Sequence, residues 1–286
     1  MAKKIVVDEI TRGIRADVLV SGLFPRVSRS YLQKQFEAGK VTANNKEVKP
    51  GYKLRLGDRL HIEFEEQTLD QIPNIDLPIL YEDERILVIN KPVGVISHSR
   101  GRYWNEPSVA SFVRQKTGQE GDRTGIVHRL DRATSGVMIC AKNAAILSFL
   151  QKQFSLRKVS KTYKAVIQGT IDPTEAIIDM PIERNPKAPA TFRVGANGKA
   201  SSTRYKIIKN DENFSLLELK PLTGRTHQLR VHLQHLGRPI VGDTLYGGLA
   251  ADRLMLHAYS LELTMPDGGK RLFRAPLPHG FALKDA

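Results

Sequence analysis

The stretch GIVHRLDRATSGVMICAK, residues 125–142, joins a charged segment to an apolar one. Residues 137–141 form a short apolar run of the kind that fills a buried strand. Directly before this run, Asp131 lies between Arg129 and Arg132. Its carboxylate is expected to stay ionised at neutral pH if either guanidinium is near, which makes it a candidate nucleophile or base. The alternative is an Arg–Asp pair that stabilises a loop.

The composition is that of an ordinary folded protein. The chain has 286 residues, 41% hydrophobic and 26% charged, and this length suggests about two domains. No apolar run approaches the roughly 20 residues of a membrane span, and the first residues lack the apolar segment and cleavage site of a signal peptide. The single cysteine, Cys140, excludes an intrachain disulfide and a multi-cysteine zinc site. We therefore expect a cytoplasmic protein with no membrane partner.

The charge balance points to a polyanionic partner. The chain carries 44 Lys and Arg against 30 Asp and Glu, a formal net charge of +14. An excess of this size favours nucleic acid first and an anionic membrane surface second. Charge alone does not distinguish RNA from DNA.

Residues 12–66 are expected to form a small α+β module. Two short helices, at 17–24 and 29–38, are followed by short strands with turns at Asn44-Asn45 and Gly57-Asp58. The polar face is basic, because residues 12–64 carry eleven Lys and Arg against five Asp and Glu, a net charge of +6.

The module resembles the small RNA-binding domain of the ribosomal-protein-S-four type. The resemblance rests on the pattern Ser28-Arg29-x-x-Leu32, then Gly39-x-Val41, then Gly57-Asp58-x-Leu60. It implies that RNA is bound by the polar side chains around the second helix, namely Arg26, Ser28, Arg29, Lys34 and Lys40. The alternative is a basic face that only contacts solvent.

Residues 67–77 are polar and without clear period, and we interpret them as a linker. The remaining residues, 78–286, are expected to form one larger domain. Its strands are expected at 86–89, 161–168, 203–209, 214–220 and 255–264. Its helices are expected at 107–116 with Pro107 in the first turn, from the cap Asn143 to about 156, and at 229–236. Because the strands do not alternate regularly with helices, the pattern predicts an α+β domain with a mostly antiparallel mixed sheet.

Three further stretches carry residues that could do chemistry. Lys91-Pro92-Val93-Gly94 predicts a rigid turn in which Lys91 could meet a phosphate, although a plain turn is favoured. Tyr163 lies in an expected strand among lysines, where a core position is the alternative to a catalytic one. Arg225 precedes the helix at 229–236, whose N-terminus would favour an anion.

Three histidines in this last region, at 227, 232 and 235, could suggest a metal site. We expect none, because no carboxylate shares their spacing and only His232 and His235 lie on one helix face.

Together these motifs resemble the RluA family of RNA pseudouridine synthases. The first two are Lys91-Pro92-x-Gly94 and His128-Arg129-Leu130-Asp131-Arg132-x-Thr134-Ser135-Gly136. The third is Gly224-Arg225-Thr226-His227-Gln228-Leu229-Arg230-Val231-His232. The last two are Gly242-Asp243-x-x-Tyr246-Gly247 and Arg253-x-x-Leu256-His257-Ala258. The resemblance runs from about residue 80 to residue 275.

The resemblance implies a reaction that isomerises uridine to pseudouridine within RNA, in a central RNA-binding cleft. Asp131 matches the catalytic aspartate, as nucleophile on the ribose or as base at its 2′-carbon. Arg230 matches an arginine that pairs with the aspartate, and Tyr163 a tyrosine that stacks on the base and helps to remove the proton from carbon 5. Leu229 matches the apolar residue of the uracil pocket, and Arg129 the residue that fills the gap left by the flipped nucleotide.

The same resemblance places Arg132, Arg225 and His227 at the substrate and implies no cofactor and no metal. A flipped uridine costs a few kcal/mol, and a guanidinium can fill the resulting gap. A hydrolytic glycosidase usually needs two carboxylates, whereas these motifs offer one, which suits an isomerase.

Several alternatives remain at this level. Large-subunit ribosomal RNA is the favoured substrate and transfer RNA the second choice. A non-catalytic RNA-binding or ribosome-assembly factor and an RNA N-glycosidase are the competing functions. A monomer is expected.

Overall fold

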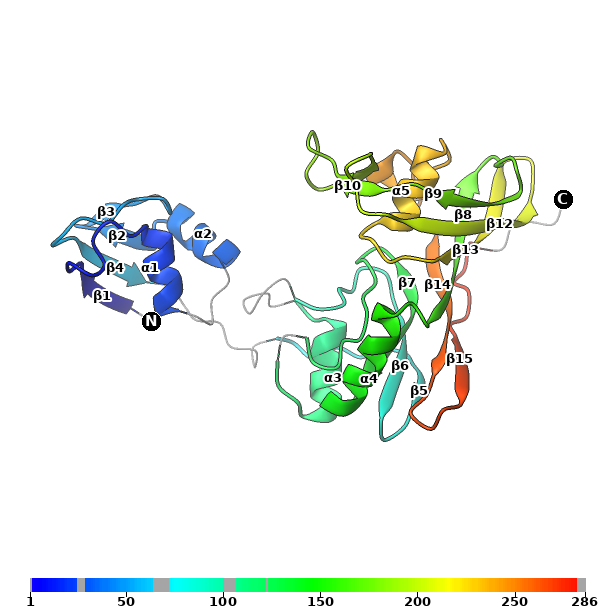
Figure 1. The fold of residues 1–286 in the computed structure, drawn as a ribbon, viewed down its shortest axis with the longest axis horizontal. Helices are drawn as coiled ribbons and strands as arrows, with labels where there is room; N and C mark the ends of the chain where they lie inside the picture. The colour runs from blue at the N-terminus through cyan, green and yellow to red at the C-terminus, as the bar shows by residue number, and fades with distance from the viewer. Residues whose placement is uncertain (1, 25–28, 64–71, 100–105, 122, 282–286) are drawn as a thin grey trace. The chain divides into compact units, whose positions relative to one another are not determined.

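The computed structural model describes residues 2–24, 29–63, 72–99, 106–121 and 123–281. The side chains at 29 and 30 also lie outside the description. Contacts divide the chain into two units, which we treat separately (Figure 1). The N-terminal unit comprises Met1–Asn74 and Ser99–Pro107, and the C-terminal unit comprises Ile75–His98 and Ser108–Ala286.

The N-terminal unit is a four-stranded antiparallel sheet with two helices. Its elements are β1 (Ala2–Val6), α1 (Ala16–Leu23), α2 (Arg29–Glu37), β2 (Val41–Ala43), β3 (Lys46–Glu47) and β4 (Arg59–Glu63). The strand order is β1-β4-β2-β3. Side chains from both helices and from β4 meet in one core that includes Val20, Leu32, Phe36, Leu60 and Ile62. The short helices are therefore stabilised by packing on the sheet.

The expected turns of this unit are confirmed. Asn44 and Asn45 have φ of 52° and 63°, the left-handed conformation that a two-residue hairpin requires. Leu56 lies beside the Gly57-Asp58 turn, outside β4, and its side chain is 54% exposed. Strand β1 lies before residue 12, where the sequence places the start of the module, yet it pairs with β4 along its whole length.

The C-terminal unit is built on a mixed sheet of nine strands. Its strand order is β5-β6-β7-β14-β8-β13-β12-β9, with β15 paired to β14. These strands are β5 (Ile79–Glu82), β6 (Ile86–Lys91), β7 (Ser135–Ala141), β8 (Ser160–Gln168), β9 (Glu175–Asp179), β12 (Ser202–Asn210), β13 (Phe214–Pro221), β14 (Leu256–Thr264) and β15 (Lys270–Arg274). Only β7 and β14 pair in parallel, so the predicted α+β fold with a mostly antiparallel mixed sheet is confirmed.

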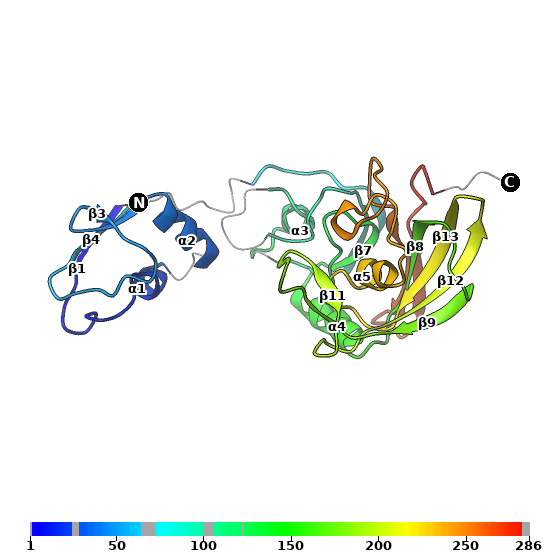
Figure 2. The ribbon, with the colours of Figure 1, turned by 90° about the horizontal axis from the view of Figure 1, so that it is seen from above.

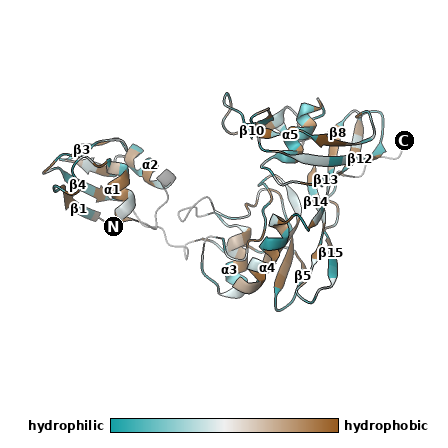
Figure 3. Cartoon of the chain, viewed as in Figure 1, coloured by the Kyte–Doolittle hydropathy of each residue, from teal (hydrophilic) through white to brown (hydrophobic). Residues whose placement is uncertain are grey.

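Helices cover the two halves of this sheet separately. α3 (Val109–Thr117) and α4 (Ala144–Ser155) pack against β6 and β7, and these two helices carry apolar residues (Figure 3). α5 (Gln228–His235) packs on the half that contains β8 and β13, whose strands curve around it (Figure 2). A separate hairpin, β10 (Ile182–Arg184) with β11 (Phe192–Val194), and a short 3-10 helix, η2 (Thr244–Tyr246), lie beside α5.

The expected caps are confirmed in one helix and corrected in another. Asn143 accepts a hydrogen bond from the Ile146 N–H and so begins α4, as predicted. α3 instead begins at the cap Ser108, so Pro107 precedes the helix and is not in its first turn. The last residues of the expected linker belong to the larger unit, because Ile75 and Leu77 pack on its core, whereas 67–71 lie outside the described residues.

β7 is the strand that residues 137–141 predict, and all seven of its residues are buried. Its second residue, Gly136, has φ of 119°, and a Cβ there would lie 2.2 Å from the Ala258 carbonyl oxygen. Only glycine permits this approach of β7 to β14.

We expect Gly136→Ala to lower the free energy of unfolding by about 3 kcal/mol, through backbone strain and steric overlap. Urea unfolding of the full chain measures the loss. Gly224→Ala is the control, because its Cβ would meet nothing within 4 Å. An equal, small effect of both substitutions would contradict the close approach of the two strands.

Candidate active site

The loop before β7 carries Asp131 and is connected to the chain segment after β6. The Ser97 hydroxyl donates to the Leu130 carbonyl (2.7 Å) and accepts from the Leu130 N–H (3.0 Å). The Gly94 N–H donates to the carbonyl of Arg132 (2.9 Å). These bonds bracket Asp131 on both sides, so its backbone position is fixed by residues far away in the sequence.

Lys91 supports the same loop from below the surface. Its side chain is fully buried, and its ammonium donates to the carbonyls of Pro92 (2.9 Å), Val95 (2.8 Å) and Arg132 (3.4 Å). Burial lowers the pKa of Lys91 to about 7, although the nearby Asp131 charge acts in the opposite direction. Lys91 therefore stabilises a turn, which was the favoured interpretation, and is not exposed to a phosphate.

Arg132 lies outside the lining of the pocket next to Asp131. Its exposed side chain donates to the Gly94 carbonyl (3.1 Å), in the turn that follows β6. The expected contact of Arg132 with substrate stays a prediction.

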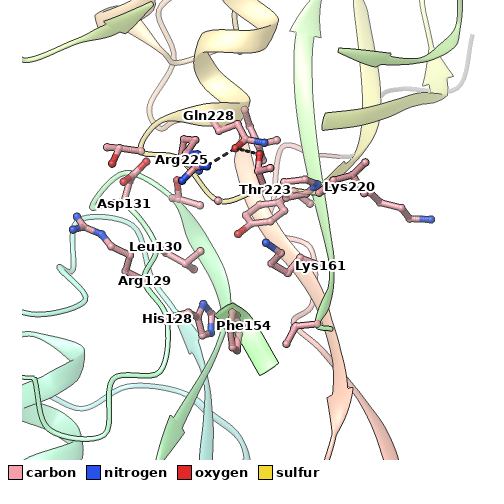
Figure 4. A pocket seen from close by; sticks show the side chains of 18 of the residues that line it. His128, Arg129, Leu130, Asp131, Phe154, Lys161, Lys220, Thr223, Arg225 and Gln228 are labelled. Carbon is pink, nitrogen blue, oxygen red and sulfur yellow. Dashed lines mark hydrogen bonds between the residues drawn. The ribbon is translucent and has the colours of Figure 1, made fainter. Parts of the chain in front are cut away.

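A pocket of about 800 Å³ lies beside Asp131 (Figure 4). It is lined by the loop at 128–134, the end of α4, the start of β8, the loop at 220–227 and the start of α5. Of the residues that the sequence singles out, it brings together Arg129, Asp131, Tyr163, Arg225, His227, Leu229 and Arg230.

The charge of this pocket is strongly one-sided. Its described lining contains the cations Arg129, Arg157, Lys158, Lys161, Lys220, Arg225 and Arg230. The only carboxylate among the same residues is that of Asp131. Such a surface attracts a polyanion and presents one acid to it.

The partner predicted for Asp131 is wrong in this structure. Arg230 instead forms a bidentate pair with Asp243, with Nε–Oδ2 at 2.7 Å and Nη2–Oδ1 at 2.6 Å. Both side chains are nearly or fully buried, and a buried guanidinium needs a carboxylate that accepts both of its donors. Among the described residues, the nearest ionisable partner of the Asp131 carboxylate is His227, whose Nε2 lies 3.8 Å from Oδ2.

Tyr163 lies on β8 at the junction of the two halves of the sheet. It contacts the cores on both sides and faces the pocket. Burial raises the pKa of the Tyr163 phenol, and the Asp131 charge raises it further. Leu229, the second residue of α5, lines the same pocket and is 6% exposed.

Side chains around Arg225 shape the start of α5. Gln228 Oε1 accepts from the Arg225 N–H (3.0 Å) and from the Thr223 hydroxyl (2.6 Å), bonds that Figure 4 marks. Arg225 itself donates from Nε to the Ala200 carbonyl (3.2 Å). The sequence motifs contain Gln228, but its role in ordering this loop depends on contacts that a linear pattern does not display.

Two of the three histidines that could suggest a metal, His227 and His232, have hydrogen-bond partners within the fold. His232 is fully buried between the Thr203 hydroxyl (2.9 Å from Nδ1) and the Met180 carbonyl (3.0 Å from Nε2). In the part of the chain that the structure describes, no three His, Cys, Asp or Glu side chains gather as metal ligands would.

Sequence reasoning overlooked the far end of the pocket. There His128 stacks on Phe154 at 4.6 Å, and its Nε2 accepts from the Ile139 N–H (3.1 Å) (Figure 4). Burial lowers the pKa of His128 to about 3, so the ring is neutral. Lys161 lies two residues before Tyr163 on β8 and also lines the pocket, as the period of two along a strand indicates.

Comparison with known proteins now identifies the family and the fold. Residues 85–235 match the family model described as RNA pseudouridylate synthase, which covers more than half of the chain. The chain belongs to the RNA pseudouridine synthase family. Residues 14–60 match the S4 domain, as the basic module predicts.

Curated relatives of this synthase align over nearly its whole length. The ribosomal large subunit pseudouridine synthase D of Borreliella burgdorferi is 36% identical, over 94% of this chain and 88% of the relative. An RNA pseudouridine synthase of Aquifex aeolicus is 38% identical, over 90% of this chain and 87% of the relative.

A solved structure supports the fold of the synthase. Human RNA pseudouridylate synthase domain containing 1 has a TM-score of 0.59 and 30% identity, covering 71% of this chain and 85% of that chain. The reaction class and RNA as partner therefore follow from family membership. Within the described residues no helix has the length and hydropathy to cross a bilayer.

Few of the RNA-contacting residues expected in the S4 domain can be placed. Lys34 and Lys40 are exposed. Arg26 and Ser28 lie outside the described residues, as does the side chain of Arg29.

We expect Asp243→Ala to destabilise the synthase by about 3–5 kcal/mol, because it leaves the Arg230 charge buried and unpaired. The double variant Arg230→Met with Asp243→Leu should regain much of this stability without regaining turnover. Thermal unfolding and single-turnover assays of the three proteins measure both effects.

The matched control for this prediction is Glu183→Ala, which breaks the more exposed Glu183–Arg193 pair and should change stability by about 0–1 kcal/mol. If Asp243→Ala lowered stability as little as Glu183→Ala, the buried Arg230–Asp243 pair would not stabilise this site.

Proposed function

We propose that the synthase converts uridine to pseudouridine in structured RNA with Asp131 as the reacting carboxylate, and that its substrate is large-subunit ribosomal RNA. The observation that carries the proposal is the position of Asp131, the one carboxylate in a pocket lined by seven Lys and Arg side chains. The cations attract the RNA backbone, and the acid is the group that can react with the nucleoside.

The target uridine enters the pocket by leaving its stack. This flip costs a few kcal/mol, which contacts within the pocket must offset. Tyr163 offers an aromatic face for the uracil and Leu229 an apolar one. Arg129, two residues before Asp131, is the guanidinium that fills the space left in the RNA, since it can stack and donate hydrogen bonds together.

Asp131 then breaks the bond between N1 and the ribose, as nucleophile on the ribose or as base at its 2′-carbon. The detached uracil stays in the pocket, turns, and is joined to the ribose through carbon 5. A hydrolytic glycosidase would need a second carboxylate to activate water, and the described pocket lining has none.

The protonation state of the Tyr163 hydroxyl limits the role that this side chain can have. Because burial raises its pKa, the hydroxyl is protonated at neutral pH and cannot act as a free phenolate base. We therefore assign Tyr163 to stacking on the base. The Asp131 carboxylate, freed as carbon 5 joins the ribose, accepts the proton that carbon 5 loses, and N1 of the uracil takes up a proton, so the nucleoside keeps its composition.

Arg230 contributes through its position. Its guanidinium is oriented by Asp243 and lies within electrostatic range of Asp131. Arg225 and His227 complete the surface toward the substrate.

Large-subunit ribosomal RNA is the proposed substrate because two observations favour it. The relatives from Borreliella burgdorferi and Haemophilus influenzae, both 36% identical, are named for the ribosomal large subunit. The S4 domain supplies further basic residues, among them the exposed Lys34 and Lys40, for an RNA larger than one stem-loop. Transfer RNA is the second candidate. We propose that the synthase acts as a monomer.

We expect Asp131→Asn to lower the single-turnover rate by roughly 10⁴-fold or more, since the amide neither attacks nor accepts a proton. RNA affinity should stay within about threefold, because phosphate contacts dominate it. A tritium-release assay on 5-tritiated RNA, with a filter-binding titration, measures both quantities.

Asp252→Asn is the control for this substitution. It changes net charge equally, but Asp252 is exposed and outside the pocket. Turnover of Asp131→Asn near that of this control would show that Asp131 does not take part in the reaction.

The substrate is tested in cells with and without the gene. Carbodiimide treatment followed by primer extension should show at least one pseudouridine of large-subunit ribosomal RNA that disappears in the deletion strain and returns with the wild-type gene. Loss confined to transfer RNA would establish the second candidate instead.

A further inference from the structure

His227 occupies an unusual position next to Asp131. It is the residue before α5, and its φ of 56° lies in the left-handed region, which a residue with a Cβ adopts at a cost. This backbone conformation directs its ring into the pocket, where the side chain is only 16% exposed and Nε2 lies 3.8 Å from Asp131 Oδ2. Strain of this kind persists where neighbouring contacts over-determine the conformation.

The Tyr246 hydroxyl lies where it can donate its proton to one ring nitrogen of His227. Its hydroxyl lies 2.7 Å from His227 Nδ1 and accepts a hydrogen bond from the Phe192 N–H at 3.0 Å. Because the backbone N–H can only donate, the single hydroxyl proton is free to be donated to Nδ1. The neutral imidazole then carries its own proton on Nε2, the nitrogen that faces Asp131.

Aromatic contacts restrict the ring on two sides. Phe192 and Tyr246 meet His227 edge-on, with centroids at 5.7 Å and 5.6 Å. The Arg230 guanidinium lies 4.9 Å from the Tyr246 ring centroid and is itself oriented by Asp243. The imidazole therefore has little freedom to rotate.

We propose that Tyr246 and His227 are positioning residues for the reaction, in which the Tyr246 hydroxyl sets the Nε2–H form of His227 and this N–H orients the Asp131 carboxylate. The proposal rests on the proposed role of Asp131. At 3.8 Å the contact is longer than a hydrogen bond, and bonds of this type often tighten only when substrate binds.

A neutral donor suits this task better than a cation. It directs a carboxylate oxygen without cancelling the charge that makes the oxygen reactive. Several charged groups face His227: Asp131 and Asp243 favour its protonated form, whereas Arg230 and Arg129 oppose it. Burial is the largest influence and lowers the pKa of His227, and the proton donated by Tyr246 acts in the same direction.

The tautomer can be measured directly in the full-length enzyme labelled with ¹⁵N-histidine. Long-range ¹H–¹⁵N spectra should show His227 protonated on Nε2 in the wild type, with the resonance assigned by its absence in His227→Gln. Tyr246→Phe keeps the ring and removes the hydroxyl, so the preference for Nε2–H should be lost. A wild-type His227 protonated on Nδ1 would overturn the proposal.

Tyr205→Phe is the matched control. Tyr205 is a buried tyrosine of β12 whose hydroxyl donates to the Pro173 carbonyl (2.8 Å) and which does not line the pocket. It should leave the His227 resonances and turnover unchanged. Similar thermal unfolding of Tyr205→Phe and Tyr246→Phe would show that any difference in turnover is not a folding defect.

Kinetics test whether the tautomer matters for the reaction. Tyr246→Phe should lower the single-turnover rate about tenfold and leave RNA affinity unchanged, since Tyr246 is not among the residues that line the pocket. In a His227→Gln background, whose amide offers a neutral N–H that needs no tautomer, Tyr246→Phe should have almost no further effect.

Independent, multiplicative effects of the two substitutions would contradict the proposal, because Tyr246 would then not act through His227. That failure is distinct from failure of the proposed function, which would appear as turnover by Asp131→Asn.

Discussion

The active site depends on the hydrogen bonds that the buried ammonium of Lys91 donates. This ammonium joins carbonyl oxygens of the turn after β6 to the carbonyl of Arg132, in the loop that carries Asp131. A lysine ammonium is costly to bury, and the carbonyl bonds and the nearby Asp131 charge offset part of that cost. The hydrogen bonds of Lys91 hold the loop from the core side, so the Asp131 side chain is directed outward to the pocket. A reactive group needs this precision of placement, because small displacements lower rates strongly.

A second network connects the opposite side of the pocket. Asp243 orients Arg230, Arg230 lies over Tyr246, and Tyr246 bonds to His227 beside Asp131. These residues come from the start of α5 and from the loop around η2, two segments that lie far from β7 in the sequence. The site is thus formed where the two halves of the sheet meet, with Tyr163 in contact with both cores. Folding of the whole domain is required before any of these groups has its final neighbours.

Much of the architecture could be predicted from local patterns. The apolar run at 137–141 identified β7, Asn143 identified the start of α4, and Asn44-Asn45 identified a hairpin turn. The errors share a cause. Strand β1 has an exposed, lysine-rich sequence with no alternation, and it becomes a strand only by pairing with β4. Pro107 has the residue type of a first helical turn, but the capping bonds of Ser108 and Ser111 decide where α3 begins.

The sequence by itself determined the motifs, the basic charge, the reaction family and the membership of Asp131, Tyr163 and Leu229 in one site. Only the tertiary structure decided which charges pair. From the sequence, Arg129 and Arg132 are the neighbours of Asp131, and the family resemblance names Arg230 as its partner. In the fold Arg132 turns to Gly94, Arg230 turns to Asp243, and His227 lies nearest to the carboxylate. For Arg230 the physical reason is burial: a guanidinium taken from water binds the carboxylate that can satisfy its donors, and burial is a property of the packed chain.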